Sequence, residues 1–359
     1  MRNAPLPHGG NVLHYSKKFG IPAGKIIDFS ASVNPFGPPK KSLAAMSRAF
    51  AELNRYPDPD SLELTAKIAA SHGLKDDQVL IGNGSTEFIY LLPRALGVKK
   101  ALVFSPSFSD YERASELSGA KVVRLPLLEE NNFSPDIKTL SRELKKCGLL
   151  FLCNPNNPTG TLMPKDELLG LLKEASQAGT VVCIDEAFIE YVPGASVLKE
   201  AVKLGAVILR NFTKFYGMPG IRIGYAVADR KIIAKMKAAR EPWTVNNLAQ
   251  AAALAALGDG EYSKKTLAQN EAERDYLFHS LSETGWLLPF SSTANFLLVK
   301  ILEPKISSSS LTGRLAEKGL LVRDCSTFPG LGQRFLRVAV LSRRENKKLV
   351  EALKSFTTP

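Results

Sequence analysis

The stretch NFTKFYGMPGIRIGY, residues 211–225, follows directly on AVILR (206–210), whose aliphatic residues predict a buried strand. Lys214 therefore stands at the end of a buried strand, where an ammonium group is costly to desolvate unless it is paired, neutralised or used covalently. Arg222 follows eight residues later, between isoleucines and glycines that allow close approach of the backbone to a ligand. A desolvated amine beside a fixed cation is a lysine prepared to form Schiff bases. Because an isolated lysine is usually exposed, this interpretation depends on the rest of the chain.

Three earlier segments place polar side chains where a strand ends. LLFLCNPNNPTG (149–160) runs from an apolar strand into a turn rich in asparagine and proline. VVCIDEAFIEY (181–191) delivers Asp185 at the end of a strand, where open α/β sheets bind ligands. VLIGNGSTEFIYLL (79–92) leads through a glycine-rich turn into a helix, whose first amides can hold an anion. Each segment alone is ordinary turn chemistry, but their order together is specific.

With these motifs in this order, nearly the whole chain resembles the fold-type I pyridoxal 5′-phosphate (PLP) enzymes of the aspartate aminotransferase superfamily, near the histidinol-phosphate aminotransferases. The resemblance implies an α/β fold: a large domain with a mostly parallel sheet flanked by helices, and a smaller α/β C-terminal domain. The alternation of predicted strands and helices along the chain favours the same architecture. The expected division is an N-terminal segment (1–40) packed on the small domain, a large domain (41–243) and a small domain (244–359).

Carried over residue by residue, the resemblance implies that Lys214 binds the PLP aldehyde covalently, and that Asp185 pairs with the pyridine nitrogen and keeps it protonated. Asn157 is expected to hydrogen-bond the ring hydroxyl oxygen. Phe108, in SPSFSDY, matches the aromatic residue that stacks on the ring, although a plain core phenylalanine explains it equally well. The residues expected to hold the cofactor phosphate are Gly84, Ser85, Thr86, Thr213 and Arg222.

One position separates two branches of this superfamily. Histidinol-phosphate aminotransferases usually carry tyrosine where this chain has Phe188, in the motif DEAF. DEAF is common in the L-threonine-O-3-phosphate decarboxylases of cobalamin synthesis. The N-terminal stretches LPHGGNVLHYSKKFGI (6–21) and IIDFSASVNPFGPP (26–39) also resemble the opening of those decarboxylases. Without the resemblance, HGGN is typical of a loose leader.

Substrate contacts are expected from both ends of the chain. Arg337 matches the superfamily arginine that grips the substrate α-carboxylate as a bidentate fork. Arg323, in RDCSTFPGL, and His8 are expected to bind a substrate phosphate. Because the family often has asparagine at Ser32, a direct contact from that side chain is in doubt. The full set of expected substrate-binding residues is His8, Ser32, Asn34, Asn157, Arg323 and Arg337.

The reaction implied is PLP-dependent decarboxylation of L-threonine O-3-phosphate to (R)-1-aminopropan-2-ol O-2-phosphate, the linker of the cobalamin nucleotide loop. L-Serine O-phosphate is an alternative substrate, and histidinol-phosphate or related aminotransferase activity is an alternative reaction. The family implies a homodimer with shared active sites. RYPDPDS (55–61) resembles the segment that sends a tyrosine into the neighbouring site, so Tyr56 is expected to reach the partner's cofactor phosphate, although alone it reads as a turn.

Composition fits a globular enzyme: 45% of the 359 residues are hydrophobic and 23% are charged. No apolar run reaches the roughly 18 residues that span a bilayer, and the N-terminus lacks a signal-peptide core, so we expect no membrane segment. Four cysteines without CxxC spacing favour reduced thiols in a cytoplasm, and the four histidines lack metal-ligand spacing.

The net charge of +12 raises the alternative of a regulatory or nucleic-acid-binding protein on the same fold, but the lysines lack aromatic interleaving. A solvated basic surface that attracts anionic substrates is the preferred interpretation.

Overall fold

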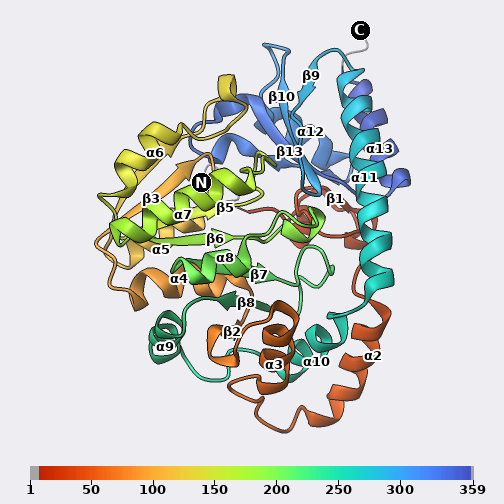
Figure 1. Ribbon diagram of the computed structural model, residues 1–359. Helices are drawn as coiled ribbons and strands as arrows, with labels where there is room; N and C mark the ends of the chain where they lie inside the picture. The colour runs from red at the N-terminus through yellow and green to blue at the C-terminus, as the bar shows by residue number, and fades with distance from the viewer. Residues whose placement is uncertain (1–7, 357–359) are drawn as a thin grey trace.

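The predicted strands form one seven-stranded sheet in the computed structural model, which describes residues 8–356. The strand order is β2-β8-β7-β6-β5-β3-β4, and every pairing is parallel except those of β8, which runs antiparallel to both neighbours. The expected mostly parallel sheet is therefore confirmed (Figure 1). The strands of this sheet are β2 (Val79–Gly82), β3 (Lys100–Ser105), β4 (Lys121–Pro126), β5 (Leu149–Cys153), β6 (Val181–Asp185), β7 (Val207–Asn211) and β8 (Gly224–Val227).

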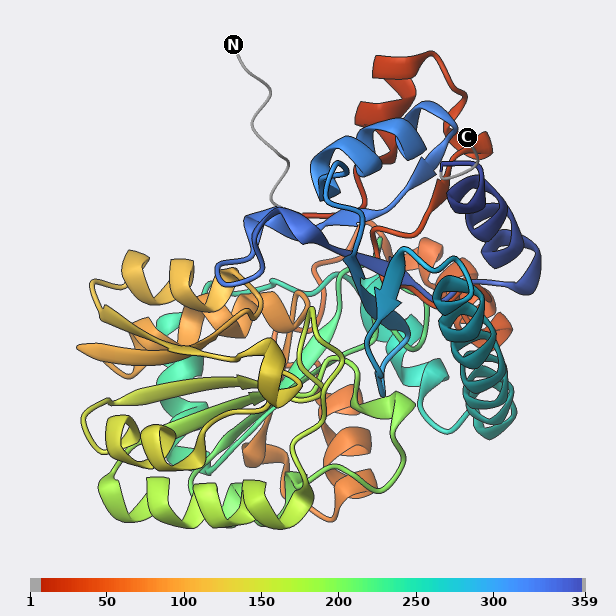
Figure 2. The same cartoon turned by 90° about the horizontal axis from the view of Figure 1, so that it is seen from above.

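Helices cover both faces of this sheet, as Figure 2 shows from above. Along β5, Leu150 and Leu152 pack into one core while Leu149 and Phe151 pack into the other, because successive side chains of a strand point to opposite faces. A strand buried on both faces reads as a continuous apolar run. One face is covered by α4 (Ser85–Ala95), α5 (Asp110–Leu117) and α9 (Arg230–Ala239), and the other by α3 (Leu62–His72), α6 (Ile137–Leu144), α7 (Lys165–Ala178), α8 (Leu198–Lys203) and α10 (Asn247–Ala256).

Helix α7 illustrates why these segments are helical. Its buried residues are Leu168, Leu171, Leu172 and Ala175, which recur at the spacing of one helix face. Gly179 ends the helix in the left-handed conformation, with φ of 73°, which glycine adopts without steric cost. The helix therefore begins and ends where its amphipathic pattern does.

A second, antiparallel sheet of order β12-β13-β10-β9 carries the C-terminal part of the chain. Ser307 caps α12, since its side chain accepts a hydrogen bond from the Ser310 amide, and the helix begins at Ser308. The elements are β9 (Leu287–Pro289), β10 (Phe296–Ile301), β12 (Arg323–Asp324) and β13 (Phe335–Ala339), with α11 (Gly260–Ser282), α12 (Ser308–Glu317) and α13 (Arg343–Lys354).

The N-terminal segment packs on this C-terminal part. Strand β1 (Ile27–Asp28) pairs in parallel with β11 (Leu320–Leu321), and the Ala339 amide donates to the Phe29 carbonyl at 2.9 Å. Helix α1 (Val12–Phe19) precedes this pair. Helix α2 (Lys40–Ala49) instead lies beside α10, where the Ser42 hydroxyl donates to the Ala252 carbonyl (Figure 1). The segment thus connects the two parts of the molecule; the predicted boundaries at 40 and 243 stay predictions.

Between residues 8 and 356, no helix has the length and apolar character that crossing a membrane requires.

Candidate active site

A pocket of about 240 Å³ opens at the edge of the large sheet where β5, β6 and β7 end. Carboxyl ends of parallel strands meet at one edge, which is where open α/β sheets bind ligands. The N-terminal segment and the small sheet close its other side. The predicted site residues that line this pocket are His8, Ser85, Thr86, Phe108, Asn157, Asp185, Thr213, Lys214, Arg222, Arg323 and Arg337.

Lys214 reaches the pocket from a turn that Asn211 fixes at the end of β7. The Asn211 Oδ1 atom accepts from the Thr213 amide at 3.0 Å, from the Thr213 hydroxyl at 2.6 Å and from the Lys214 amide at 3.3 Å. Burial, followed by the charges of Arg337 and Arg222, lowers the pKa of Lys214 to about 8. The lowered pKa leaves more of this amine neutral near pH 7 than in an exposed lysine, and the neutral amine is the nucleophile.

Asp185 ends β6 at the floor of the pocket, with only 4% of its surface exposed. Its Oδ2 atom accepts from the Tyr111 hydroxyl at 2.8 Å, and its Oδ1 atom accepts from the Ala187 amide at 3.0 Å. Burial raises the pKa of Asp185 to about 6, while these hydrogen bonds and Lys214 oppose the rise. The carboxylate remains mostly ionised at neutral pH.

An anion-binding corner forms where α4 begins. Gly84 precedes the helix with φ of 83°, and a Cβ there would lie 2.7 Å from Arg222 Nη2, so only glycine lets the guanidinium reach the first turn. Arg222 itself holds a positive φ of 55°. The helix N-terminus, the guanidinium and the hydroxyls of Ser85 and Thr86 together supply donors for a phosphate.

Arg337 crosses the pocket from β13. One Nη atom contacts the Asn157 side-chain oxygen, and Nη2 donates to the Ser30 carbonyl at 2.8 Å. Its Nε atom is buried, and among residues 8–356 it has no hydrogen-bond partner. Burial lowers the pKa of Arg337 to about 10, so the group stays charged at neutral pH. An unmatched buried donor on a charged guanidinium fits a carboxylate ligand.

Arg323 is the second cation from the small sheet, and its register partner across β12 and β13 is Arg337. Its Nη2 atom donates to the Thr327 hydroxyl at 2.7 Å, and its guanidinium lies 5.1 Å from the centre of the Phe328 ring. His8 lines the same side of the pocket, with Nε2 3.6 Å from Asp110 Oδ1. This end of the pocket is therefore basic and separate from the corner at α4.

Two predicted substrate residues do not line the pocket. The Asn34 Nδ2 atom donates to the Phe215 carbonyl at 2.7 Å and to the Thr266 hydroxyl at 3.0 Å, so this amide holds the loop after Lys214 in place. Ser32 is fully buried, and its hydroxyl has no partner within the described part of the chain. Neither residue is among those that line the pocket, and their contact with substrate stays a prediction.

Tyr56 lies outside the pocket and is 81% exposed. Its ring packs on Trp243 with 4.9 Å between ring centroids, beside a groove between α2, α3 and α10. Because its predicted role is in a partner subunit, its place in one chain leaves that role a prediction.

Sequence reasoning missed several residues that the pocket brings in. Tyr111 follows Phe108 by three residues and its amide donates to the Phe108 carbonyl at 3.3 Å, so this spacing was the available signal. Ser30 and Phe328 also line the pocket; both lie in quoted segments, but neither was singled out there. Phe188 lies against Phe296 with 5.0 Å between ring centroids. This chain therefore has an aromatic ring without a hydroxyl at the position where histidinol-phosphate aminotransferases usually carry tyrosine.

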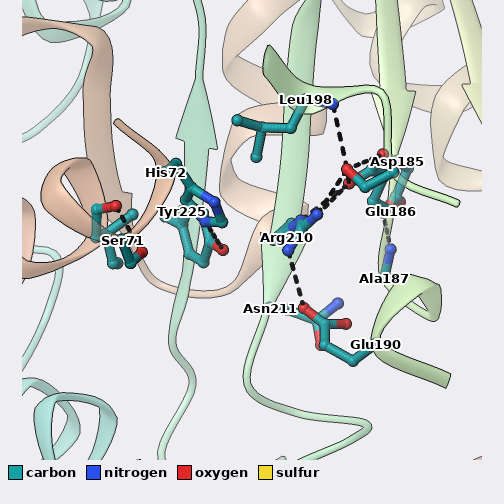
Figure 3. Close-up of polar contacts among 12 residues, drawn as sticks. Ser71, His72, Asp185, Glu186, Ala187, Glu190, Leu198, Arg210, Asn211 and Tyr225 are labelled. Carbon is teal, nitrogen blue, oxygen red and sulfur yellow. Dashed lines mark hydrogen bonds and ion pairs between the residues drawn. The ribbon is translucent and has the colours of Figure 1, made fainter. Parts of the chain in front are cut away.

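The Glu of the DEAF motif has a structural role behind the pocket (Figure 3). Arg210, on β7, pairs with Glu186 at 2.8 Å and lies 3.8 Å from Glu190. The Ser196 hydroxyl donates to the Glu186 carboxylate and accepts from Arg210. Burial raises the pKa of Glu190 to about 7. This cluster of Glu186, Glu190, Ser196 and Arg210 ties β6 to β7 directly beneath Asp185.

The donor set fits PLP. A desolvated amine, a buried carboxylate and a phosphate corner whose glycine makes room for an arginine occur in one pocket. Phe108 lines the wall of that pocket and is half-buried, with its ring edge-on to Tyr111 at 5.5 Å.

Comparisons with known proteins agree with this geometry. A Caldanaerobacter subterraneus subsp. tengcongensis protein, provisionally named threonine-phosphate decarboxylase, is 38% identical over 98% of this chain and 94% of its own length. The threonine-phosphate decarboxylase of Salmonella typhimurium is 33% identical, covering 98% of this chain and 96% of its own. The solved histidinol-phosphate aminotransferase of Clostridium acetobutylicum superposes with a TM-score of 0.86 at 33% identity, covering 91% of this chain and 98% of that one. The family model for aminotransferase class I and II matches residues 24–353, and the chain therefore belongs to the aminotransferase class I and II family.

Proposed function

We propose that this chain is a PLP-dependent decarboxylase that converts L-threonine O-3-phosphate to (R)-1-aminopropan-2-ol O-2-phosphate and carbon dioxide. The observation that carries the proposal is the pair of neighbouring arginines, Arg323 and Arg337, that face one pocket together with Lys214. A substrate with both an α-carboxylate and a phosphate uses both guanidiniums at once. Histidinol phosphate carries a phosphate but no carboxylate, so it would leave one buried cation without an anion.

In this proposal PLP is held covalently through Lys214, with its phosphate at the corner formed by α4, Thr213 and Arg222. When bound, the cofactor supplies an electron-accepting ring at the carbon that loses its carboxylate. Asp185 keeps the ring nitrogen protonated, and the Asn157 amide nitrogen donates a hydrogen bond to the ring hydroxyl oxygen. Phe108 is proposed to pack on the face of the ring.

The chain's own residues select which bond is aligned for cleavage. Arg337 grips the carboxylate through a bidentate fork, and Arg323 with His8 holds the distal phosphate. Two anchored ends would restrict rotation about Cα and so favour cleavage of the bond to the carboxylate. Binding energy at a remote group is thereby used for orientation at the reacting carbon. Lys214, whose amine has a pKa of about 8, is placed to carry the proton that Cα regains.

The substrate preference between phosphothreonine and phosphoserine depends on one methyl group. A pocket contact with a methyl discriminates by only about 1–3 kcal/mol, so both compounds are candidate substrates. The arginine pair serves either one.

The deciding experiment incubates the PLP-loaded protein with each phospho-amino acid and measures carbon dioxide and amine product. Release of carbon dioxide in equal amount to the amine, with PLP retained, supports decarboxylation. Formation of a keto product that depends on 2-oxoglutarate, without carbon dioxide, identifies the protein as an aminotransferase instead. Histidinol phosphate in the same assay is the matched comparison.

We also propose that the protein is a cytoplasmic homodimer. Large apolar side chains are exposed near the groove that holds Tyr56; they are Phe50, Leu53, Tyr56, Leu62 and Trp243, here called the α2–α3 patch. The groove beside it is lined by both Arg48 and Glu52, so a second copy turned about a two-fold axis can offer complementary charges. The four cysteines are buried free thiols, as expected in a reducing compartment.

A further inference from the structure

The second residue of α5 makes a direct contact with the floor of the site. Tyr111 is 1% exposed, and its hydroxyl donates to Asp185 Oδ2 at 2.8 Å. The other carboxylate oxygen accepts from the Ala187 amide at 3.0 Å. One donor on each oxygen fixes the plane of the carboxylate as well as its position.

The phenol ring has little freedom to turn. It stacks on Phe151 of β5 at 5.1 Å with 10° between the ring planes. It also meets Phe108 edge-on at 5.5 Å. A ring clamped by a stacked partner and an edge-on partner presents its hydroxyl in one direction, so the bond to Asp185 is preorganised rather than adopted on ligand binding.

The hydrogen bond from Tyr111 stabilises the ionised form of Asp185. Burial works against its ionised form and is the largest influence on it. A hydrogen bond donated to a carboxylate favours the ionised state. Burial and the neighbouring carboxylate of Asp185 both raise the pKa of Tyr111 well above 10, so the phenol remains a protonated donor at every pH where the protein works.

We propose that Tyr111 is a positioning residue for the cofactor: its hydroxyl holds Asp185 as an oriented carboxylate, which in turn keeps the cofactor ring nitrogen protonated. The inference rests on the proposed use of PLP and adds a determinant that the motifs do not contain. A phenylalanine at this position would keep the stacking and lose only the donor. Asp185 then becomes a stronger base, and the proton shared with the ring nitrogen moves toward the carboxylate.

The test uses Tyr111→Phe and PLP alone, without substrate. We expect the dissociation constant of PLP for the apoenzyme to rise about tenfold, the low end of the loss of a hydrogen bond to a charged group. With PLP labelled with ¹⁵N at the pyridine nitrogen, the resonance of the bound cofactor moves toward that of unprotonated pyridine. The pH below which PLP affinity falls should also be higher in this variant than in the wild type.

Tyr225→Phe is the matched control. Tyr225 is also buried, at 5% exposed, but its hydroxyl pairs with His72 Nε2 at 3.2 Å, away from Asp185 (Figure 3). Both variants lose one buried hydroxyl and are compared by thermal unfolding, but only Tyr111→Phe should change the ¹⁵N signal. If both leave PLP affinity and the ¹⁵N resonance as in the wild type, Tyr111 merely packs, and the inference is wrong.

A double-mutant cycle tests whether Tyr111 affects PLP affinity through Asp185 or independently of it. In an Asp185→Asn background, Tyr111→Phe should change the PLP dissociation constant by less than about twofold, because coupled residues are non-additive. A full tenfold loss in that background would show that Tyr111 acts independently of Asp185. These readouts need PLP but no turnover. If the wild-type protein does not bind PLP, the proposed function itself is refuted. If the wild-type protein decarboxylates its substrate but the Tyr111→Phe variant binds PLP normally, only the inference about Tyr111 is refuted.

Discussion

The amine of Lys214 experiences opposing charges within one pocket. Arg337 and Arg222 disfavour its protonation, while Asp185 favours it, and burial adds to the effect of the arginines. The same arginines are the proposed ligands for two anions. The groups that are proposed to bind the cofactor and substrate therefore also activate the nucleophile, and each anion that binds changes the basicity of the lysine.

Capture of PLP by the apoenzyme should depend on pH with a midpoint near 8, because a neutral Lys214 amine is required and the pKa of this group is lowered to about 8. The rate should rise as the pH increases from 6, reach half its maximum near 8 and level off about one pH unit above that midpoint. Stopped-flow absorbance on mixing apoenzyme with PLP measures it, and Lys214→Ala is the control without covalent capture. A midpoint near the usual lysine pKa of about 10.4 would contradict the interpretation that the Lys214 amine is desolvated.

Replacing Arg323 by alanine should raise the KM for phosphothreonine at least about tenfold, because a hydrogen bond to a charged group is worth about 1.5–3 kcal/mol. PLP affinity should stay near the wild-type value, since Arg323 lies at the other end of the pocket from the α4 corner. Arg314→Ala is the matched control: it removes an exposed arginine that packs on Phe356 outside the pocket. Equal losses of substrate and PLP affinity would show that Arg323 has a different role.

At the scale of single residues, the sequence was informative where a side chain follows a strand directly. Asp185 stands one residue and Lys214 five residues after a buried aliphatic run, and both line the pocket. The hydrogen bonds of Asn34 were not predictable, because they go to residues far along the chain, Phe215 and Thr266, and no local pattern reveals them. The spacing of Tyr111 from Phe108 was a local signal, but its hydrogen bond to the distant Asp185 was not predictable.

Among the elements, β6 and β7 depend on the buried cluster of Glu186, Glu190, Ser196 and Arg210. The Arg210 side chain is 12% exposed and serves two carboxylates, of which Glu186 is 1% exposed. A buried ion pair contributes little net stability when intact, but its disruption is costly because one charge is left unpaired.

Arg210→Met should lower the free energy of unfolding by about 3–5 kcal/mol, because it leaves Glu186 buried without its cation. Adding Glu186→Gln to this variant should recover part of the loss. Urea denaturation of the apoenzyme measures both. Lys300→Met is the matched control: it breaks a partly exposed pair with Glu129, and such pairs contribute about 0–1 kcal/mol. Similar losses in both single variants would show that burial of the Arg210 cluster is unimportant.

The elements of the large sheet were predictable because a strand buried on both faces is a continuous apolar run between turn residues. Predicted strands at 149–153 and 206–210 agree with β5 and β7 to within one residue. The short strands β1 and β11 were not predictable, since two residues carry no periodicity and their pairing joins segments almost 300 positions apart. The start of α12 was not predictable either, because serines serve loops and helix caps equally well.

For the whole molecule, we expect a dimer that depends on the α2–α3 patch. Leu53→Asp places a charge on a residue that is 61% exposed within this patch, and it should shift the protein from dimer to monomer in analytical ultracentrifugation. Leu117→Asp alters a leucine that is 70% exposed at the end of α5, outside the patch, and should leave the dimer intact. A wild-type protein that sediments as a monomer at micromolar concentration would overturn the proposed assembly.

The parallel pairing of β1 with β11 also has a consequence for biosynthesis. A ribosome delivers residues 27–28 early, but their hydrogen-bonding partners at 320–321 emerge only when translation is nearly complete. Pocket residues from the first forty positions, such as His8 and Ser30, therefore wait for Arg323 and Arg337. The nascent large sheet can fold during elongation, whereas a catalytically competent centre matures only after the final tenth of the polypeptide has been made.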